Sequence, residues 1–329
     1  MAAAGALSDL IALGGAGMSV SDLSDGPVAP HPPGPGVVRI GVHRHGVRPT
    51  GGLEPFDILL SAEASAPMPW VGCGPEALET ALESLSAVVE RQPLATAVAA
   101  QVFRATLALA FDHALALESF AYSMLLASRE FRAWRAANPP RRRDEPAAPR
   151  VRIEPDGQAI LIRLARPAAR NAFDAAMRDE LCEALTFARD HPDAPPVILR
   201  GDGPAFSAGG DLAEFGSAED PGQAHLIRSL RSPARLVHDL GSRMTSRLHG
   251  ACIGAGIEVP AAAARVIAAE DAVFRLPEVS MGLIPGAGGT ATIPRRIGRH
   301  RACYLAISGA ELRLETALAW KLVDDRIAP

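Results

Sequence analysis

The second half of the chain alternates short apolar runs with amphipathic segments, which predicts strands and helices in turn. Residues 159–164 and 196–200 are apolar runs of strand length, and residues 174–189 between them read as an amphipathic helix behind a possible N-cap at Asn171. The alternation continues with helical patterns at about 222–241, a strand near 243–248 and a helix from about 256. Strands that alternate with helices in this way favour an α/β core with crossover helices.

Residues 75–138 show a helical pattern instead. Leu78, Leu82 and Leu85 recur at three- and four-residue spacing, and Pro93 interrupts the pattern. Two further runs keep this spacing: Leu94, Val98, Val102, Phe103 and Leu107, then Leu117, Phe120, Ala121, Met124 and Leu125. Prolines and charges then predict a linker over residues 139–150.

The composition before these helices changes twice. Residues 1–36 are rich in Gly, Pro, Ala and Ser and bury little, so we expect a mobile arm. Residues 37–74 hold two short apolar runs, 37–42 and 56–60, and predict an irregular segment with short strands. The predicted order is therefore an arm, a short-strand segment, the helices, a linker, and a core over residues 151–329.

Composition excludes several classes of protein. Hydrophobic residues make up 48% of the chain, enough for a sizeable core, and a net charge of −4 gives no global reason to expect a nucleic-acid partner. The four cysteines lie far apart and the nine histidines form no metal-ligand spacing, so neither a disulfide framework nor a metal site is expected. The longest apolar run, 251–264, is interrupted by Glu258 and Pro260 and is too short to span a bilayer. We therefore expect a cytoplasmic protein that does not engage membranes.

Two glycine-rich turns stand where a strand meets a helix. Residues 208–211 (AGGD) and 250–258 (GACIGAGIE) each leave backbone N–H groups free at a helix start. Two such turns in one domain can supply the paired donors of an oxyanion hole. The first is equally consistent with a tight turn in which Asp211 caps a helix.

Two glutamates are candidates for acid–base chemistry. Glu258 lies in a helix's first turn inside an apolar run, where it either faces solvent or is a desolvated catalytic group. Glu278 precedes the glycine-rich segment 282–290, which lacks the GK[ST] ending of a phosphate-binding loop. Paired carboxylates, one acid and one base, suit the addition or removal of water. Their spacing in sequence does not establish that they face each other.

Taken in order, these motifs resemble the crotonase (enoyl-CoA hydratase/isomerase) superfamily. The matching segments are RPAARNA (166–172), AFSAGGDL (205–212), GACIGAGIE (250–258), LPEVSMGLIPGAGGT (276–290) and LAWKLVD (318–324). They span about residues 151–327. The resemblance implies an α/β, crotonase-like spiral of ββα units, here with an added α-helical N-terminal region.

The resemblance also implies roles for individual residues. Glu258 and Glu278 match the two glutamates of hydratases, the N–H groups of Gly210 and Ala255 match the oxyanion hole, and Gly286 matches the glycine that positions the catalytic water. The implied substrate contacts are Ala168, Ala172, Ala208, Gly210, Asp211 and Leu212.

The layout departs from the family's in one respect. Family members continue past the segment that matches residues 322–329, into helices that complete the pocket and the trimer, whereas residues 75–138 resemble those helices. We therefore hypothesise a circular permutation, or an equivalent substitution, in which the N-terminal helices occupy that space. The alternative is that amphipathic Ala- and Leu-rich helices simply look alike.

The resemblance implies an enoyl-CoA hydratase, a lyase that adds water reversibly and syn to a 2-enoyl-CoA thioester. No cofactor is implied beyond the coenzyme A of the substrate, and the implied assembly is a homotrimer or a dimer of trimers. Isomerase, decarboxylase or oxidative chemistry on a CoA ester stays open, as does a non-catalytic acyl-CoA-binding subunit. Acyl-group identity and the physiological direction are not determined.

Overall fold

The N-terminal segment of the computed structural model, which describes residues 17–26, 34, 36–140, 148–218 and 220–327, forms a parallel sheet. Its strands lie in the order β1 (Met18–Asp22), β2 (Val38–His43), β3 (Ile58–Ser61) and β4 (Val71–Gly72). The prediction of an arm over residues 1–36 is wrong for β1, whose Met18 pairs with Val38 of β2. That strand is short, polar and only half-buried, so it gives no apolar signal and is held by its backbone pairing. Residues 1–16, 27–33 and 35 of the expected arm lie outside the described residues.

Four helices follow, in the region predicted to be helical. They are α2 (Leu78–Arg91), α3 (Pro93–Thr106), α4 (Phe111–Leu126) and α5 (Arg129–Ala137). Pro93 separates the first two and begins α3, where its missing N–H costs no hydrogen bond. On α4, Phe120 and Met124 are exposed, and the buried stripe includes Ala114, Glu118 and Leu125.

The second half builds two sheets, as the alternating pattern predicts. The larger has the order β13 (Asp325–Arg326), β10 (Arg265–Ala268), β8 (Met244–Leu248), β7 (Val197–Gly201), β6 (Ala159–Leu164) and β5 (Val151–Asp156). Only the β5–β6 pair is antiparallel among its described strands. The smaller has the order β12 (Leu312–Arg313), β11 (Val273–Arg275) and β9 (Ala251–Ile253).

Helices connect and cover these strands. They are α6 (Ala175–Arg189), α7 (Pro221–Leu230), α8 (Pro233–Asp239), α9 (Ala255–Glu258), α10 (Gly289–Ile297), α11 (Arg299–Ser308) and α12 (Leu314–Trp320). The N-cap of α6 is Asp174, which accepts a hydrogen bond from the Met177 N–H at 2.7 Å, and not Asn171 as predicted. Asn171 instead donates its side-chain amide to the carbonyls of Asp202 and Ala205.

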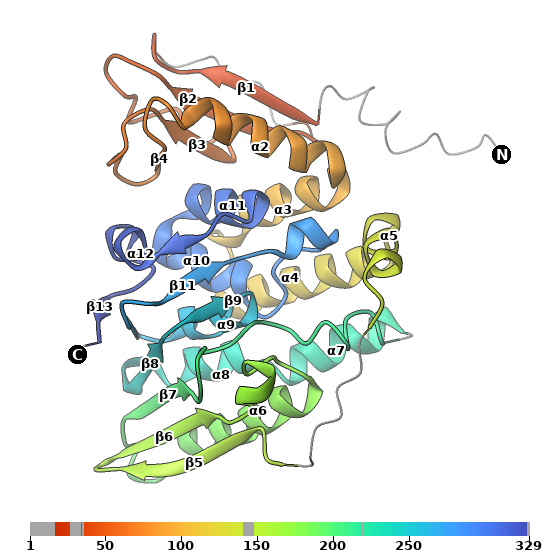
Figure 1. Ribbon diagram of the computed structural model, residues 1–329, viewed down its shortest axis with the longest axis vertical. Helices are drawn as coiled ribbons and strands as arrows, with labels where there is room; N and C mark the ends of the chain where they lie inside the picture. The colour runs from red at the N-terminus through yellow and green to blue at the C-terminus, as the bar shows by residue number, and fades with distance from the viewer. Residues whose placement is uncertain (1–16, 27–33, 35, 141–147, 219, 328–329) are drawn as a thin grey trace, which may run out of the picture.

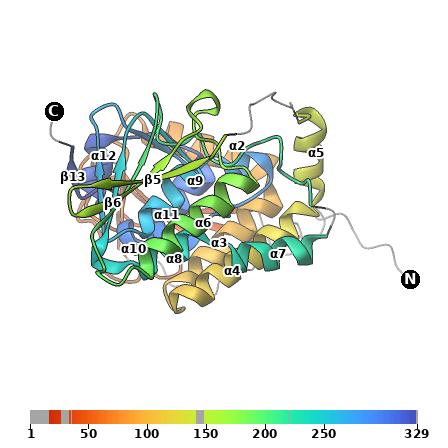
Figure 2. The ribbon, with the colours of Figure 1, turned by 90° about the horizontal axis from the view of Figure 1, so that it is seen from below.

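The N-terminal helices lie between the two parts of the molecule. Figure 1 shows the N-terminal sheet and strands β5–β8 toward opposite ends of the long axis, with α3, α4, α10 and α11 between them. Figure 2 shows α4 beside α7, and the two helices are in contact. A single cluster of buried apolar side chains runs through both halves, from Ile40 to Phe103 to Val323. No described helix combines the length and apolarity that a bilayer crossing requires.

Candidate active site

Gly254 lies beside both of the glutamates that the sequence singles out. It lies at the start of α9 with φ of +51°, a conformation that favours glycine. A Cβ atom at this position would lie 2.4 Å from Oε1 of Glu278 and 3.7 Å from Oε1 of Glu258. Both carboxylates therefore face the same small volume beside Gly254.

Glu258 is a desolvated group and not a solvent-facing helix-start charge. It is 2% exposed, and its Oε2 accepts hydrogen bonds from the N–H groups of Ala287 at 2.7 Å and Gly289 at 2.9 Å. Burial raises the pKa of Glu258 to about 7, while the backbone donors of Ala287, Gly289 and Gly286 lower it. Glu258 is thus positioned to exchange a proton near neutral pH.

Glu278 is buried with less support. It begins a 3₁₀ turn at Glu278–Met281, and its Oε2 has no hydrogen-bond partner. Burial, followed by repulsion from Glu258, raises the pKa of Glu278 well above its ordinary value. This carboxyl therefore holds its proton more tightly than an ordinary glutamate does.

A third buried glutamate, Glu118 of α4, joins the site. Its Oε1 accepts from the Gly288 N–H at 2.7 Å, and its Oε2 accepts from the N–H and hydroxyl of Thr290 at 2.7 and 2.8 Å. Burial, followed by repulsion from Glu258, raises the pKa of Glu118 to about 8, and the Thr290 and Gly288 donors oppose this. Sequence reasoning missed this residue, although a glutamate in the buried stripe of a helix was a usable signal.

Two free N–H groups face the same cavity. Gly210 and Ala255 both line it, and within the described residues neither N–H donates a backbone hydrogen bond. Gly210 lies in a parallel bridge whose bonds use the Phe173 and Asp211 N–H groups, and Ala255 is the first residue of α9. Both predicted donor residues are therefore part of the same cavity lining.

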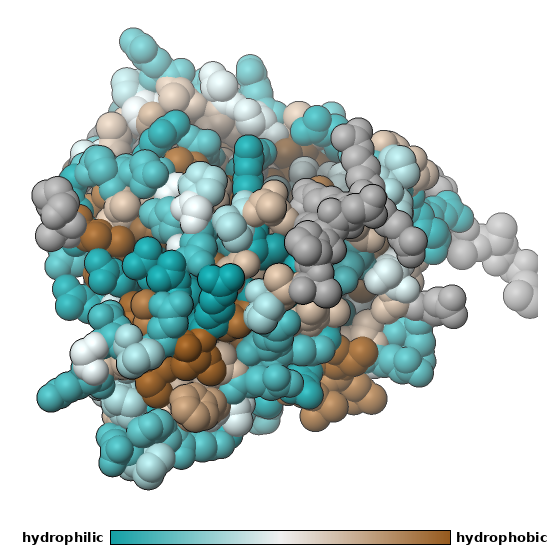
Figure 3. Space-filling model, turned by 60° about the horizontal axis from the view of Figure 1, so that its bottom comes forward, coloured by the Kyte–Doolittle hydropathy of each residue, from teal (hydrophilic) through white to brown (hydrophobic). Residues whose placement is uncertain are grey.

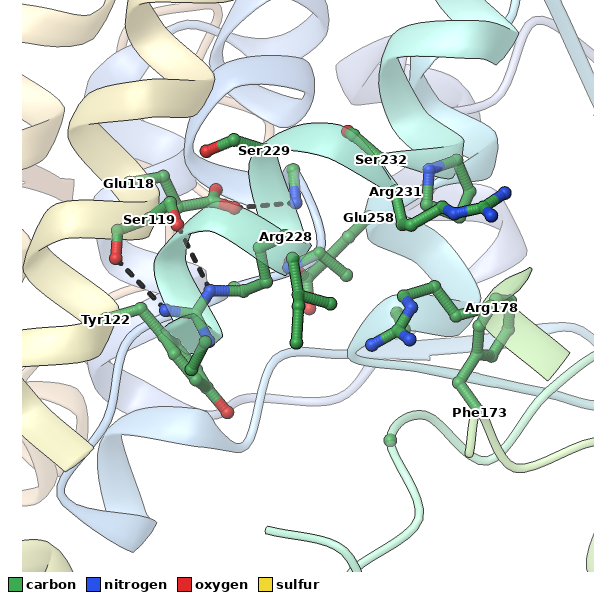
Figure 4. Close-up of a pocket in the computed structure, with 18 of the residues that line it drawn as sticks. Glu118, Ser119, Tyr122, Phe173, Arg178, Arg228, Ser229, Arg231, Ser232 and Glu258 are labelled. Atoms are coloured by element: carbon green, nitrogen blue, oxygen red, sulfur yellow. Dashed lines mark hydrogen bonds between the residues drawn. The ribbon is translucent and has the colours of Figure 1, made fainter. Parts of the chain in front are cut away.

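The cavity has a volume of about 480 Å³ and lies between α4, α7 and the glycine-rich loops. Figure 4 shows Glu118, Ser119 and Tyr122 of α4 on one side and Phe173 and Arg178 on the other, with Arg228 and Glu258 between them. The predicted residues that line it are Glu258, Glu278, Gly210, Ala255, Gly286 and Asp211. Four predicted contacts lie outside this lining, so their role stays a prediction: Ala168, Ala172, Ala208 and Leu212.

Asp211 has a structural role in this arrangement. Its Oδ2 pairs with Nη1 of the buried Arg166 at 2.8 Å, and the same nitrogen lies 3.2 Å from Oδ2 of Asp174. Its Oδ1 also accepts from the Ala213 N–H at 3.0 Å, as a capping carboxylate does. Arg166 thereby fixes the turn that holds Gly210.

Tyr122 of α4 packs on Gly286. A Cβ atom at Gly286 would lie 2.3 Å from Cδ2 of Tyr122, so only glycine allows this approach. An N-terminal helix therefore forms a wall of the site, as the hypothesis of displaced helices requires. Among the described residues, no group of three or more His, Cys, Asp or Glu side chains is placed to hold a metal ion.

Comparison with known proteins shows similarity to enoyl-CoA hydratases and isomerases. The enoyl-CoA hydratase/isomerase family pattern matches residues 155–329. A protein named probable enoyl-CoA hydratase from Rhodobacter capsulatus is 36% identical over 180 residues, covering 53% of this chain and 69% of the relative. An enoyl-CoA isomerase/hydratase of Mycosarcoma maydis is 34% identical over 191 residues, with 54% and 69% covered.

Solved structures of enoyl-CoA hydratases also resemble this chain. The crystal structure of enoyl-CoA hydratase from Thermoplasma volcanium superposes with a TM-score of 0.50 at 34% identity, covering 55% of this chain and 72% of that one. This confirms the predicted crotonase-like α/β core. The matched family pattern covers more than half of the chain, and the chain therefore belongs to the enoyl-CoA hydratase/isomerase (crotonase) family.

Proposed function

We propose that this protein is an enoyl-CoA hydratase that adds water to a 2-enoyl-CoA thioester. The observation that carries the proposal is that Glu258 and Glu278 both lie beside Gly254. The cavity that they line is also lined by Gly210 and Ala255. Family membership supports acyl-CoA chemistry, and the retention of two buried carboxylates favours hydration within it.

The thioester carbonyl oxygen accepts hydrogen bonds from Gly210 and Ala255. These donors stabilise the enolate-like charge that develops on the oxygen as water attacks Cβ, and loss of one such donor typically costs about 3–4 kcal/mol of barrier lowering. Because both donors are fixed backbone groups, they need no rearrangement during the reaction.

The two glutamates divide the proton transfers. Glu258, with a pKa of about 7, takes a proton from the attacking water in its ionised form. Glu278, whose pKa burial and the nearby Glu258 raise, delivers a proton to Cα from its protonated form. The water oxygen forms a bond to Cβ, and a proton is added to Cα on the same face. The product thus gains the atoms of one water molecule, and return of the proton from Glu258 to Glu278 restores both carboxyl groups. Gly286 is assigned to hold that water.

Incubation with crotonyl-CoA tests the proposal. Loss of the enoyl absorbance with formation of 3-hydroxybutyryl-CoA, identified by mass spectrometry, is the expected result, and Glu258→Gln should slow it by about 10²–10⁴-fold. If crotonyl-CoA binds but no hydroxyacyl product forms with several enoyl-CoA chain lengths, the hydratase assignment fails. A shifted double bond would indicate isomerase chemistry, and binding without any reaction would indicate an acyl-CoA-binding subunit.

We also propose that α2–α5 take the place of the C-terminal helices of the family. Support comes from α4, which lies outside the matched region yet supplies Glu118 and Tyr122 to the cavity. A variant in which residues 75–150 are moved behind Pro329 through a flexible linker should fold and keep turnover. If this rearranged variant folds but α4 no longer lines the active site, the proposal that α2–α5 replace the family's C-terminal helices is wrong.

The proposed assembly is a homotrimer or a dimer of trimers. Large apolar side chains of α4 and α7 are exposed, at 60% for Phe120, 53% for Met124 and 73% for Leu230. Figure 3 likewise shows apolar residues gathered in brown patches on a largely hydrophilic face. Light scattering should give about three or six times the 34.4 kDa of one chain, and a monomer would contradict the assignment.

A further inference from the structure

Arg228 of α7 places a positive charge inside the cavity. It is partly buried, and α4 holds its side chain: Nε donates to Oγ of Ser119 at 3.1 Å, and Nη2 donates to the Ser119 carbonyl at 3.3 Å and to Oγ of Ser123. The guanidinium carbon lies 4.9 Å from the centre of the Tyr122 ring. Figure 4 shows the guanidinium directed at these residues.

No carboxylate of the described residues forms an ion pair with this guanidinium, although Glu118 lies near enough to raise its pKa against the effect of burial. Arg228 forms no ion pair among the described residues, its Nη1 has no hydrogen-bond partner there, and burial lowers its pKa. Most carboxylates around the cavity have other partners. Glu118 and Glu258 accept hydrogen bonds from the 287–290 loop, and Asp174 and Asp211 pair with Arg166. Glu214 accepts a hydrogen bond from the Ala175 N–H, and Asp112 is exposed. A partly desolvated cation without a paired carboxylate attracts an anionic ligand, because the ligand supplies the missing negative charge.

Arg228 lies near Gly286, the residue proposed to position the water. One Tyr122 ring separates it from Gly286, because the ring contacts the guanidinium and also packs against the Gly286 Cα. With the thioester oxygen at Gly210 and Ala255 and Cβ near Glu258, the side of the cavity lined by α4 and α7 is left for the acyl chain.

We propose that Arg228 binds a carboxylate at the far end of the acyl group, so that the substrate class is the mono-CoA thioester of an unsaturated dicarboxylic acid. The inference rests on the proposed function for the placement of the thioester. The phosphates of coenzyme A carry the same kind of charge, but the long pantetheine arm separates them from the thioester, whereas Arg228 contacts the Tyr122 ring that packs on Gly286. Nη1 of Arg228, which has no partner among the described residues, can donate a charge-assisted hydrogen bond to one carboxylate oxygen.

Matched substrates test the assignment without any variant. Pentenoyl-CoA and glutaconyl-CoA, and hexenoyl-CoA and hexenedioyl-CoA, differ only in whether the chain ends in a methyl or a carboxylate group. The wild-type protein should favour the carboxylate member of at least one pair by about 10- to 100-fold in kcat/KM, the usual worth of a charge-assisted hydrogen bond. Equal or better use of both methyl-ended esters overturns the proposal.

Variants then identify the group responsible. Arg228→Gln, which can still bond to Ser119, should abolish the preference, and Arg228→Lys should retain part of it. Arg313→Gln removes one exposed arginine far from the cavity lining and serves as the control. A preference that survives in a folded Arg228→Gln, checked by thermal unfolding, also overturns the proposal.

Binding separates this inference from the proposed function. Calorimetry with the unreactive esters glutaryl-CoA and pentanoyl-CoA, and with free coenzyme A, requires no turnover. Arg228→Gln should weaken glutaryl-CoA about 10- to 100-fold relative to pentanoyl-CoA. If glutaryl-CoA shows this dependence while no enoyl ester is hydrated, the hydratase assignment fails and the carboxylate site stands. If free coenzyme A weakens as much as glutaryl-CoA, Arg228 binds phosphate and the proposal is wrong.

Discussion

The carboxylates of Glu118 and Glu258 hold one loop between them. Four successive N–H groups, from Ala287 to Thr290, alternate between the two: the first and third donate to Glu258, and the second and fourth donate to Glu118. Glu118 comes from an N-terminal helix 170 residues before Gly288 in the chain. The position of a proposed catalytic carboxylate therefore depends on a helix outside the family match.

Replacing Glu118 tests this dependence. Glu118→Ala would leave three buried donors of Gly288 and Thr290 without an acceptor, so we expect a loss of roughly 3–5 kcal/mol in the free energy of unfolding, with lower turnover. Glu118→Gln keeps one acceptor oxygen and should cost less. Urea unfolding followed by circular dichroism measures both; an alanine variant as stable as wild type would show that Glu118 does not hold the loop.

Gly254→Ala should impair turnover more than folding. The added Cβ would meet Glu278 Oε1 and displace it, and a misplacement of about 1 Å can cost about 10²-fold in rate. Gly157→Ala is the matched control, because its φ is +61° but nothing lies within 4 Å of the new Cβ. Both variants place a side chain at a positive φ, and only Gly254→Ala adds a contact with Glu278. Equal turnover of the two variants would mean that Gly254 does not position the glutamates.

The sequence predicted those parts of the site that are local in the chain. The turn that holds Ala255, and the two glutamates, each belong to a short motif whose residue types indicate a helix start or an acid–base group. The helix expected after the turn at residues 208–211 is wrong: residues 212–216 form turns, and the next helix is α7. Periodicity likewise located helices α2, α3 and α4 and the core strands β6, β7 and β8, whereas α5 and the other core strands were not predicted individually.

What the sequence did not reveal depends on contacts between distant segments. The pairing of β1 with β2 has no apolar signature, because backbone hydrogen bonds and not burial hold the strand. Glu118 and Arg228 act through residues more than a hundred positions away, Gly288 and Ser119 respectively. Periodicity of one helix cannot say which partner its buried charge will meet.

The rate of hydration should follow a bell-shaped pH profile. Glu258 acts as a base only when ionised, so kcat/KM should fall as pH drops through about 7, the raised pKa of this residue. Glu278 acts as an acid only when protonated, so the rate should fall again at high pH, as that raised pKa is passed. Crotonyl-CoA hydration measured across the pH range reports both limbs. An acidic limb near the ordinary glutamate pKa of about 4.3 would contradict the desolvated base.

Arg166 should be far more important for stability than an exposed arginine. Arg166→Met leaves the buried carboxylates of Asp174 and Asp211 without this partner, and removal of one member of a buried ionic network typically costs about 3–5 kcal/mol. Arg189→Met breaks the exposed pair with Asp190 and should cost far less, because solvent screens that pair. Thermal unfolding compares the two, and similar losses would argue against a structural role for Arg166.

The most direct test of the account is the rate of crotonyl-CoA hydration by Glu278→Gln. Glu270→Gln is the matched control, because Glu270 is exposed and its partner among the described residues is Arg326 on the surface. We predict that Glu278→Gln lowers kcat by about 10²–10⁴-fold while crotonyl-CoA still binds, and that the control keeps wild-type turnover. Wild-type turnover in Glu278→Gln would contradict the assignment of Glu278 as the proton donor and, with it, the two-glutamate hydratase.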